Sequence, residues 1–265
     1  MSESKNRIST LELDSRNEAS DVNELGMLGR RLEGVKRVGT GLAFVLFPLL
    51  FVFAFAVHPG LLNPHQLSPE EVILRAYQNP LLAFGHVLVL FDAAILVVVT
   101  LRFMKLLESS SLAWTGLVGA ALNVLGTILL GAEKGAESLT ISALNSLPPN
   151  QFAQMMPGLV AIFSHEGWMF LVDGVVLIAV GFSIQAIGML KTNVIPRWQS
   201  ALLLMSIWML GWPDGEEIIA LTGSILLSVA LVPYGIQIIK EPPMGHLPLR
   251  PKFMPHAVKK RECKF

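Results

Sequence analysis

Residues 81–101 read LLAFGHVLVLFDAAILVVVTL and decide the fold class. A helix needs about 20 mostly apolar residues to cross roughly 30 Å of hydrocarbon. This stretch is long enough, and its ionisable side chains are one histidine, His86, and one carboxylate, Asp92. It therefore predicts a membrane-spanning helix that carries two side chains with acid–base chemistry.

The rest of the chain has the same character, with 52% hydrophobic and only 15% charged residues and a mean hydropathy of +0.57. Soluble domains carry roughly 25% charged residues. The sequence predicts an all-α polytopic membrane bundle of six transmembrane helices, at residues 38–57, 81–101, 112–131, 168–190, 196–212 and 218–239. An alternative joins the last two stretches in one re-entrant hairpin, but Asp214, Glu216 and Glu217 between them favour an exit into water.

Basic residues predict the orientation of the spans, because loops on the cytoplasmic side are enriched in Lys and Arg. The flank before the first span and the second-to-third, fourth-to-fifth and C-terminal flanks are basic, whereas the three opposite loops together contain only Arg75 and Lys134. Both termini are therefore expected in the cytoplasm. The expected location is the plasma (inner) membrane, with the lipid bilayer as the surrounding partner.

The two ends differ from the middle. Residues 1–37 are polar, with a short amphipathic helix or a frayed tail just before the first span. Residues 240–265 are rich in proline and end in basic residues, which predicts an extended cytoplasmic tail that contacts lipid headgroups. The single cysteine, Cys263, allows no internal disulfide.

Asp92 and Asn123 are the polar residues expected nearest the bilayer midplane. Asp92 lies ten residues before Arg102, which is about 15 Å along a helix. Because the second and third predicted spans are joined by a short loop, the two side chains could hydrogen-bond across neighbouring helices. This pair either stabilises the helix interface or forms part of a proton, ion or substrate site.

A second group of polar residues is expected in the outer half of the bundle. His165, Glu166 and Asp173 come at the start of the fourth predicted span, and His86 comes at the start of the second. His165, Glu166 and Asp173 are candidates for acid–base catalysis, and these three together with His86 are candidates for binding a divalent cation. Glu137, Glu216 and Glu217 are expected instead to be loop carboxylates in water.

The segment Val194-Ile195-Pro196-Arg197-Trp198 resembles a cytoplasmic-loop signature of uncharacterised prokaryotic multi-span membrane proteins. The resemblance implies a multi-span topology in a prokaryotic inner membrane and no particular activity. The sequence contains no phosphate loop or nucleophile elbow, identifies no cofactor, and gives no indication of nucleic-acid binding.

Two function classes remain open on these residues. The first is a small permease, or an accessory subunit with a membrane-protein partner or a second copy of the chain. The second is an intramembrane enzyme, or an ion- or proton-coupled protein, that uses an acidic and histidine-bearing pocket in the outer half. Convergence of His86, Asp92 and Asp173 on one cavity would favour the second class.

Overall fold

The computed structural model describes residues 3–58, 61, 67–211 and 216–241, with side chains described from Met27 onward except that of Arg30. The expectations for Trp212, Asp214, the tail after residue 241 and Cys263 lie outside the described residues. The described chain forms nine helical segments and no strand, so the predicted all-α class is confirmed. The segments are α1 (Glu3–Ala56), α2 (Pro69–Ala76), α3 (Pro80–Leu107), α4 (Ala113–Asn145), α5 (Pro149–Phe163), α6 (Glu166–Gly174), α7 (Val176–Thr192), α8 (Arg197–Leu210) and α9 (Glu217–Lys240).

Five stretches of helix are long and apolar enough to cross a membrane, judged by length and composition. They are Met27–Ala56, Pro80–Leu107, Ala113–Asn145, Glu166–Thr192 and Glu217–Lys240. These helices are compatible with an integral membrane protein. They coincide with five of the six predicted spans. The exception is the predicted span at residues 196–212, where α8 has 14 residues and is about 21 Å long, less than an ordinary span needs.

Several predicted spans have different bounds in the structure: the helix of the first begins at Glu3, and that of the second continues to Leu107. The third was expected to end at residue 131, but α4 continues to Asn145. The fourth is divided into α6 and α7, with Val175 serving as the C-cap of one segment and the N-cap of the other. The extension of α4 has a functional consequence, because Glu133 and Glu137 become helical residues in place of loop residues.

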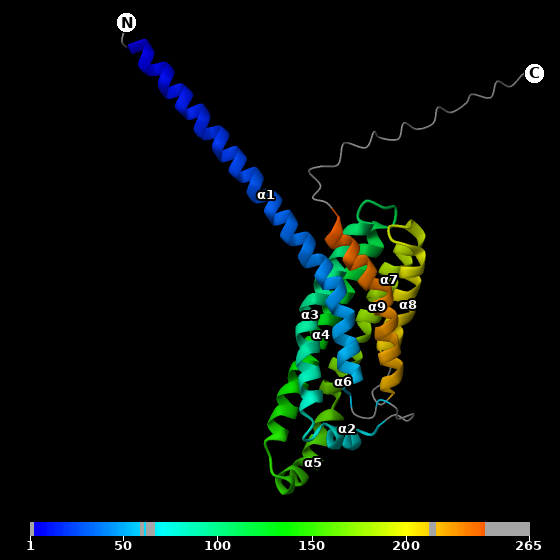
Figure 1. The fold of residues 1–265 in the computed structure, drawn as a ribbon. Helices are drawn as coiled ribbons and strands as arrows, with labels where there is room; N and C mark the ends of the chain where they lie inside the picture. The colour runs from blue at the N-terminus through cyan, green and yellow to red at the C-terminus, as the bar shows by residue number, and fades with distance from the viewer. Residues whose placement is uncertain (1–2, 59–60, 62–66, 212–215, 242–265) are drawn as a thin grey trace, which may run out of the picture. The chain divides into compact units, whose positions relative to one another are not determined.

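The chain divides into two compact units, residues 38–239 and the two ends, residues 1–37 with 240–265. Within residues 38–239, α3 packs against α4, α4 against α7, and α7 against α8 (Figure 1). The short helices α2 and α5 pack against each other at one end of these long helices (Figure 1).

Aromatic rings fill the centre of this unit. Phe103 is fully buried between Phe44 and Phe182, at ring-centroid distances of 5.2 and 6.1 Å and with both pairs edge to face. In a bilayer the lipid tails are as apolar as these rings, so close packing is what favours helix association over lipid contact. The rings therefore specify which helix faces meet.

Close approach of α4 and α7 depends on two glycines. A Cβ built on Gly119 would lie 2.6 Å from the carbonyl oxygen of Gly181, and a Cβ on Gly181 would lie 2.6 Å from that of Gly119. Neither position has room for a side chain without separation of the helices. This contact fixes α4, and with it the ionisable side chains that α4 carries toward its C-terminal end.

Candidate functional site

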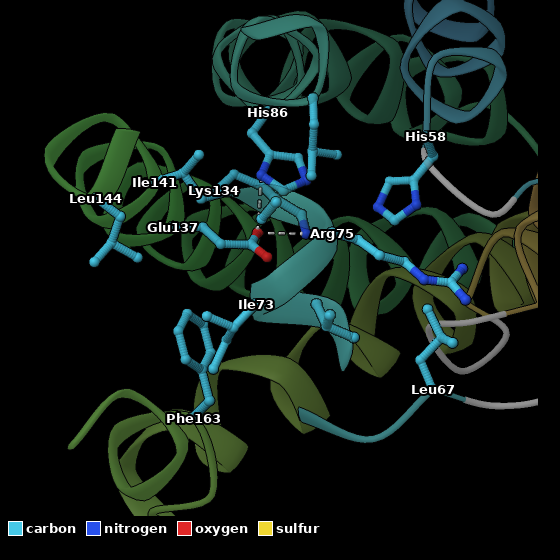
Figure 2. Close-up of a pocket in the computed structure, with 13 residues that line it drawn as sticks. His58, Leu67, Ile73, Arg75, His86, Lys134, Glu137, Ile141, Leu144 and Phe163 are labelled. Atoms are coloured by element: carbon cyan, nitrogen blue, oxygen red, sulfur yellow. Dashed lines mark hydrogen bonds and ion pairs between the residues drawn. The ribbon is translucent and has the colours of Figure 1, made fainter. Parts of the chain in front are cut away.

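A cavity lies where α2 and α5 meet the ends of α3 and α4, and it encloses about 590 Å³ counted out to open solvent. The polar residues that line it are His58, Arg75, His86, Lys134 and Glu137. Apolar lining comes from Ile73, Leu82, Ile141, Leu144 and Phe163, among others (Figure 2).

His86 of α3 is held by a carboxylate of α4. Its Nδ1 lies 3.5 Å from Oε2 of Glu137, and both side chains are buried. Lys134 donates to the same Glu137 oxygen at 2.9 Å and lies 3.0 Å from Oε1 of Glu133. The lysine therefore lies between two buried carboxylates, an arrangement in which the charged hydrogen bonds are strong and each charge has a partner.

His58, two residues beyond the end of α1, is held in the same way by the first residue of α9. Its Nδ1 lies 3.1 Å from Oε1 of Glu217, a carboxylate with a side chain only 4% exposed. The rings of His58 and His86 are 6.2 Å apart between centroids, with their planes at 41° (Figure 2). We call these residues the histidine–glutamate network: His58, His86, Glu133, Lys134, Glu137 and Glu217.

The network brings together four separate parts of the chain, the end of α1 and helices α3, α4 and α9. A histidine–carboxylate pair becomes an ion pair only when the imidazole is protonated, and histidine changes charge near neutral pH. Each imidazole has a carboxylate within 3.5 Å or less. The arrangement can therefore accept a proton at either ring and stabilise the resulting charge away from bulk water.

Arg75 of α2 is the other cation at the cavity. Among the described residues it makes no ion pair, because Glu137 is taken by Lys134 and His86, and Glu217 by His58. Glu71, one turn earlier on α2, is occupied by the helix cap. Its carboxylate accepts the backbone N–H of Ser68 at 2.8 Å and the Ser68 hydroxyl at 2.9 Å, and these bonds, with a smaller contribution from the charge of Arg75, lower the pKa of Glu71.

Contacts between α2, α4 and α5 hold this end of the unit together. Tyr77 stacks on Phe152 with centroids 3.8 Å apart, and its hydroxyl donates to the carbonyl of Leu147 at 2.7 Å. The backbone N–H of Gln78, at φ 57°, donates to Oδ1 of Asn145 at 2.6 Å. The wall that carries Arg75 is thus tied to the C-terminal end of α4.

Asp92 lies deep in the helix unit, 1% exposed, and neither carboxyl oxygen has a hydrogen-bond partner in the described structure. The expected hydrogen bond with Asn123 is therefore wrong. His86 and Asp92 belong to the same buried stripe of α3. Asp92 does not line the cavity.

Asn123 bonds instead to a residue of α7. Its Nδ2 donates to Oε1 of Gln185 at 3.1 Å, and Nε2 of Gln185 lies 3.2 Å from the carbonyl oxygens of Thr100 and Gly116. Gln185 is fully buried. This bridge joins α3, α4 and α7 and has the character of a structural contact, because Gln185 of α7 is bonded to both α3 and α4, although Oδ1 of Asn123 has no hydrogen-bond partner in the described structure.

The three predicted catalytic candidates His165, Glu166 and Asp173 are exposed at the protein surface, and none lines the cavity. His165 is the N-cap of α6, where its Nδ1 accepts the backbone N–H of Gly167 at 3.2 Å. Of the three residues whose convergence on one cavity would favour the second function class, His86 lines the cavity, and Asp92 and Asp173 do not. Across the described part of the chain, no three His, Cys, Asp or Glu side chains are grouped so as to hold a metal ion.

Sequence reasoning missed His58, Lys134 and Arg75 as site residues and assigned Glu137 and Glu217 to water-facing loops. For Glu137 a signal was present. The buried positions of α4 recur every three or four residues from Thr115 through Leu130 to Leu144, and Glu133 and Glu137 fall on that same stripe. For His58 there was no comparable signal, because it follows the helix end and its neighbours in space come from α3 and α9.

Comparisons with protein-family models, with curated proteins and with solved structures find no match.

Proposed function

We propose that this chain is a six-span membrane protein of the permease type, which binds a small molecule in the outer-end cavity and couples that binding to protonation of His58 and His86. The observation that carries the proposal is the pair of imidazoles at the cavity, each held by a buried carboxylate from another helix. An enzyme acting through His165, Glu166 and Asp173 has less support, since these side chains lie on the surface away from the cavity.

The six-span topology, with both termini on the cytoplasmic side of the plasma membrane, is part of the proposal. Its support is the alternation of basic and non-basic flanks. Further support comes from α8, which lies beside α7 and approaches α9 so closely that a Cβ on Gly223 would lie 2.7 Å from Cβ of Met209 (Figure 1). A 14-residue helix can cross where the bilayer is locally thinned.

Cysteine labelling in sealed right-side-out vesicles tests this topology on a C263S background. Ser146 follows α4 on the proposed outer side, and Ser109 lies in the loop before α4 on the proposed inner side. A membrane-impermeant maleimide should label S146C in intact vesicles and S109C only after the vesicles are opened. Labelling of S109C in intact vesicles would exclude the orientation.

Protonation should tighten the network. Each imidazolium would lie 3.1 or 3.5 Å from a carboxylate oxygen, whereas the two rings are 6.2 Å apart. Because Coulomb energy varies inversely with distance, the attraction within each pair exceeds the repulsion between the rings. Acidification should therefore draw the end of α1, α3, α4 and α9 together around the cavity.

Hydrogen exchange of the full chain in lipid nanodiscs tests this coupling, at about pH 5.5 and about pH 8 with the intrinsic rate corrected. Peptides covering α2 and the first turns of α9 should be better protected at the lower pH. H58Q and H86Q should each abolish the difference, whereas H165Q, which changes an exposed histidine outside the cavity, should retain it. A pH response that is unchanged in H58Q and H86Q would overturn the coupling.

A further inference from the structure

The cavity is divided between an apolar part and a cationic part. Ile73, Ile141, Leu144 and Phe163 lie toward one side, and the Arg75 guanidinium extends to the other, near His58 and Leu67 (Figure 2). A ligand that fills both parts must itself have an apolar body and a polar head. The charges around the cavity decide what the head should be.

Among the carboxylates of the network, none is left to neutralise Arg75. Glu137 contacts Lys134 at 2.9 Å and His86 at 3.5 Å, and Glu217 contacts His58 at 3.1 Å. Glu71 is hydrogen-bonded to Ser68 in the cap of α2 and interacts with Arg75 electrostatically, without an ion-pair contact in the described structure. With the rest of the network internally paired, the guanidinium is the cavity cation without an ion-pair partner in the described structure.

From this charge distribution we infer that the cavity binds an amphipathic anion, with its carboxylate or phosphate on Arg75 and its apolar chain against Ile73, Ile141 and Phe163. A guanidinium is suited to both head groups, because its planar N–H groups form two parallel hydrogen bonds with them. Protonation of His58, on the same side of the cavity in Figure 2, neutralises the negative charge of Glu217 near the bound head group. Anion binding should therefore strengthen as the pH falls. The inference rests on the proposed binding cavity and specifies its ligand.

The same chemistry occurs in a soluble organic acid and in an anionic lipid, so the experiment has two arms. In the first, the purified full chain in neutral phosphatidylcholine nanodiscs is tested with radiolabelled decanoate in a scintillation proximity assay. Decanol provides the chain without the charge, and acetate provides the charge without the chain. Decanoate should bind about tenfold or more tightly than either control, since both parts of the cavity contribute.

R75Q should weaken decanoate binding by about tenfold or more, to the level of decanol. R197Q, which removes an exposed arginine outside the cavity, is the matched control and should bind decanoate as the wild type does. A monodisperse elution profile and an unchanged unfolding temperature show that R75Q is folded. Decanoate binding that is equal in R75Q and wild type, or equal for decanoate and decanol, overturns the inference.

In the second arm, phosphatidylglycerol replaces part of the neutral lipid. Loss of decanoate binding there supports an anionic lipid as the natural source of the head group, and retained binding supports a soluble acid. The pH response of hydrogen exchange separates the two proposals. If R75Q leaves decanoate binding unchanged while hydrogen exchange in the wild type slows on acidification, the ligand class is wrong and the proton-responsive cavity stands. If both fail, the cavity is not the site.

Discussion

Replacing Lys134 by Met tests the charge balance of the network. The Lys134 side chain is 17% exposed and its Nζ lies 3.0 Å from Glu133 and 2.9 Å from Glu137, whose side chains are 8% and 11% exposed. The substitution keeps the approximate length of the side chain and removes the Lys134 cation from these two buried carboxylates, of which Glu137 keeps its contact with His86. Removal of one partner from a buried ion pair costs about 3–5 kcal/mol, so K134M should lower the free energy of unfolding by that amount.

A second substitution separates the charge effect from lost packing. K134M/E137Q removes one of the two stranded charges, and it should recover about half of the loss. K105M is the control, since Lys105 is exposed near the other end of α3 and its substitution should change stability by less than about 0.5 kcal/mol. Unfolding is followed by tryptophan fluorescence in mixed micelles with increasing sodium dodecyl sulfate. If the free energy of unfolding of K134M is within about 1 kcal/mol of that of wild type, or if adding E137Q lowers it further, the network does not have the described charge balance.

Three further predictions concern individual contacts. G181A should destabilise the α4–α7 contact by about 1–3 kcal/mol, because its Cβ would meet Asn123 and the Gly119 carbonyl; an unfolding midpoint equal to wild type would contradict this. D92N should raise the unfolding temperature, since a buried carboxyl with no partner is costly; a lower temperature would instead assign Asp92 a stabilising contact. S68A should increase hydrogen exchange in α2, because it removes the helix cap. The folded state lowers the pKa of Glu71, so in the wild type the protection of α2 by the cap should be complete above the ordinary glutamate pKa of about 4.3 and be lost as the pH falls through the lowered value. Protection of α2 that does not change with pH, after correction for the intrinsic exchange rate, would contradict the second point.

The helical class and five of the spans were predictable because membrane spans follow from local composition over about 20 residues. The start of α2 was predictable for the same local reason, since Ser68, Pro69 and Glu71 form a capping pattern that the structure contains. The fifth predicted span, at residues 196–212, corresponds to α8. The helix has only 14 residues, and the sequence predicted a longer span because apolar residues on either side extended the predicted stretch.

The site was only partly predictable, because it depends on which helix ends meet. His86 was identified, but its partner Glu137 was assigned to a loop when the third span was ended too early. His58 and Glu217 are 159 positions apart in sequence, from 58 to 217, and no periodicity within a single helix relates them. Arg75 can be identified as a site residue only in the folded chain, where the nearby carboxylates are seen to have other partners.

The account depends most directly on His58 and His86 lying next to each other at the cavity. On the C263S background, H58C/H86C should be joined within one chain by a short bifunctional thiol reagent, detected by mass spectrometry, because the native ring centroids are 6.2 Å apart. H86C/K105C, with both positions on α3 and about 28 Å apart along the helix, should not be joined by the same reagent. Cross-linking of the first pair alone is the result predicted here; absence of that cross-link in a folded double variant would contradict the site.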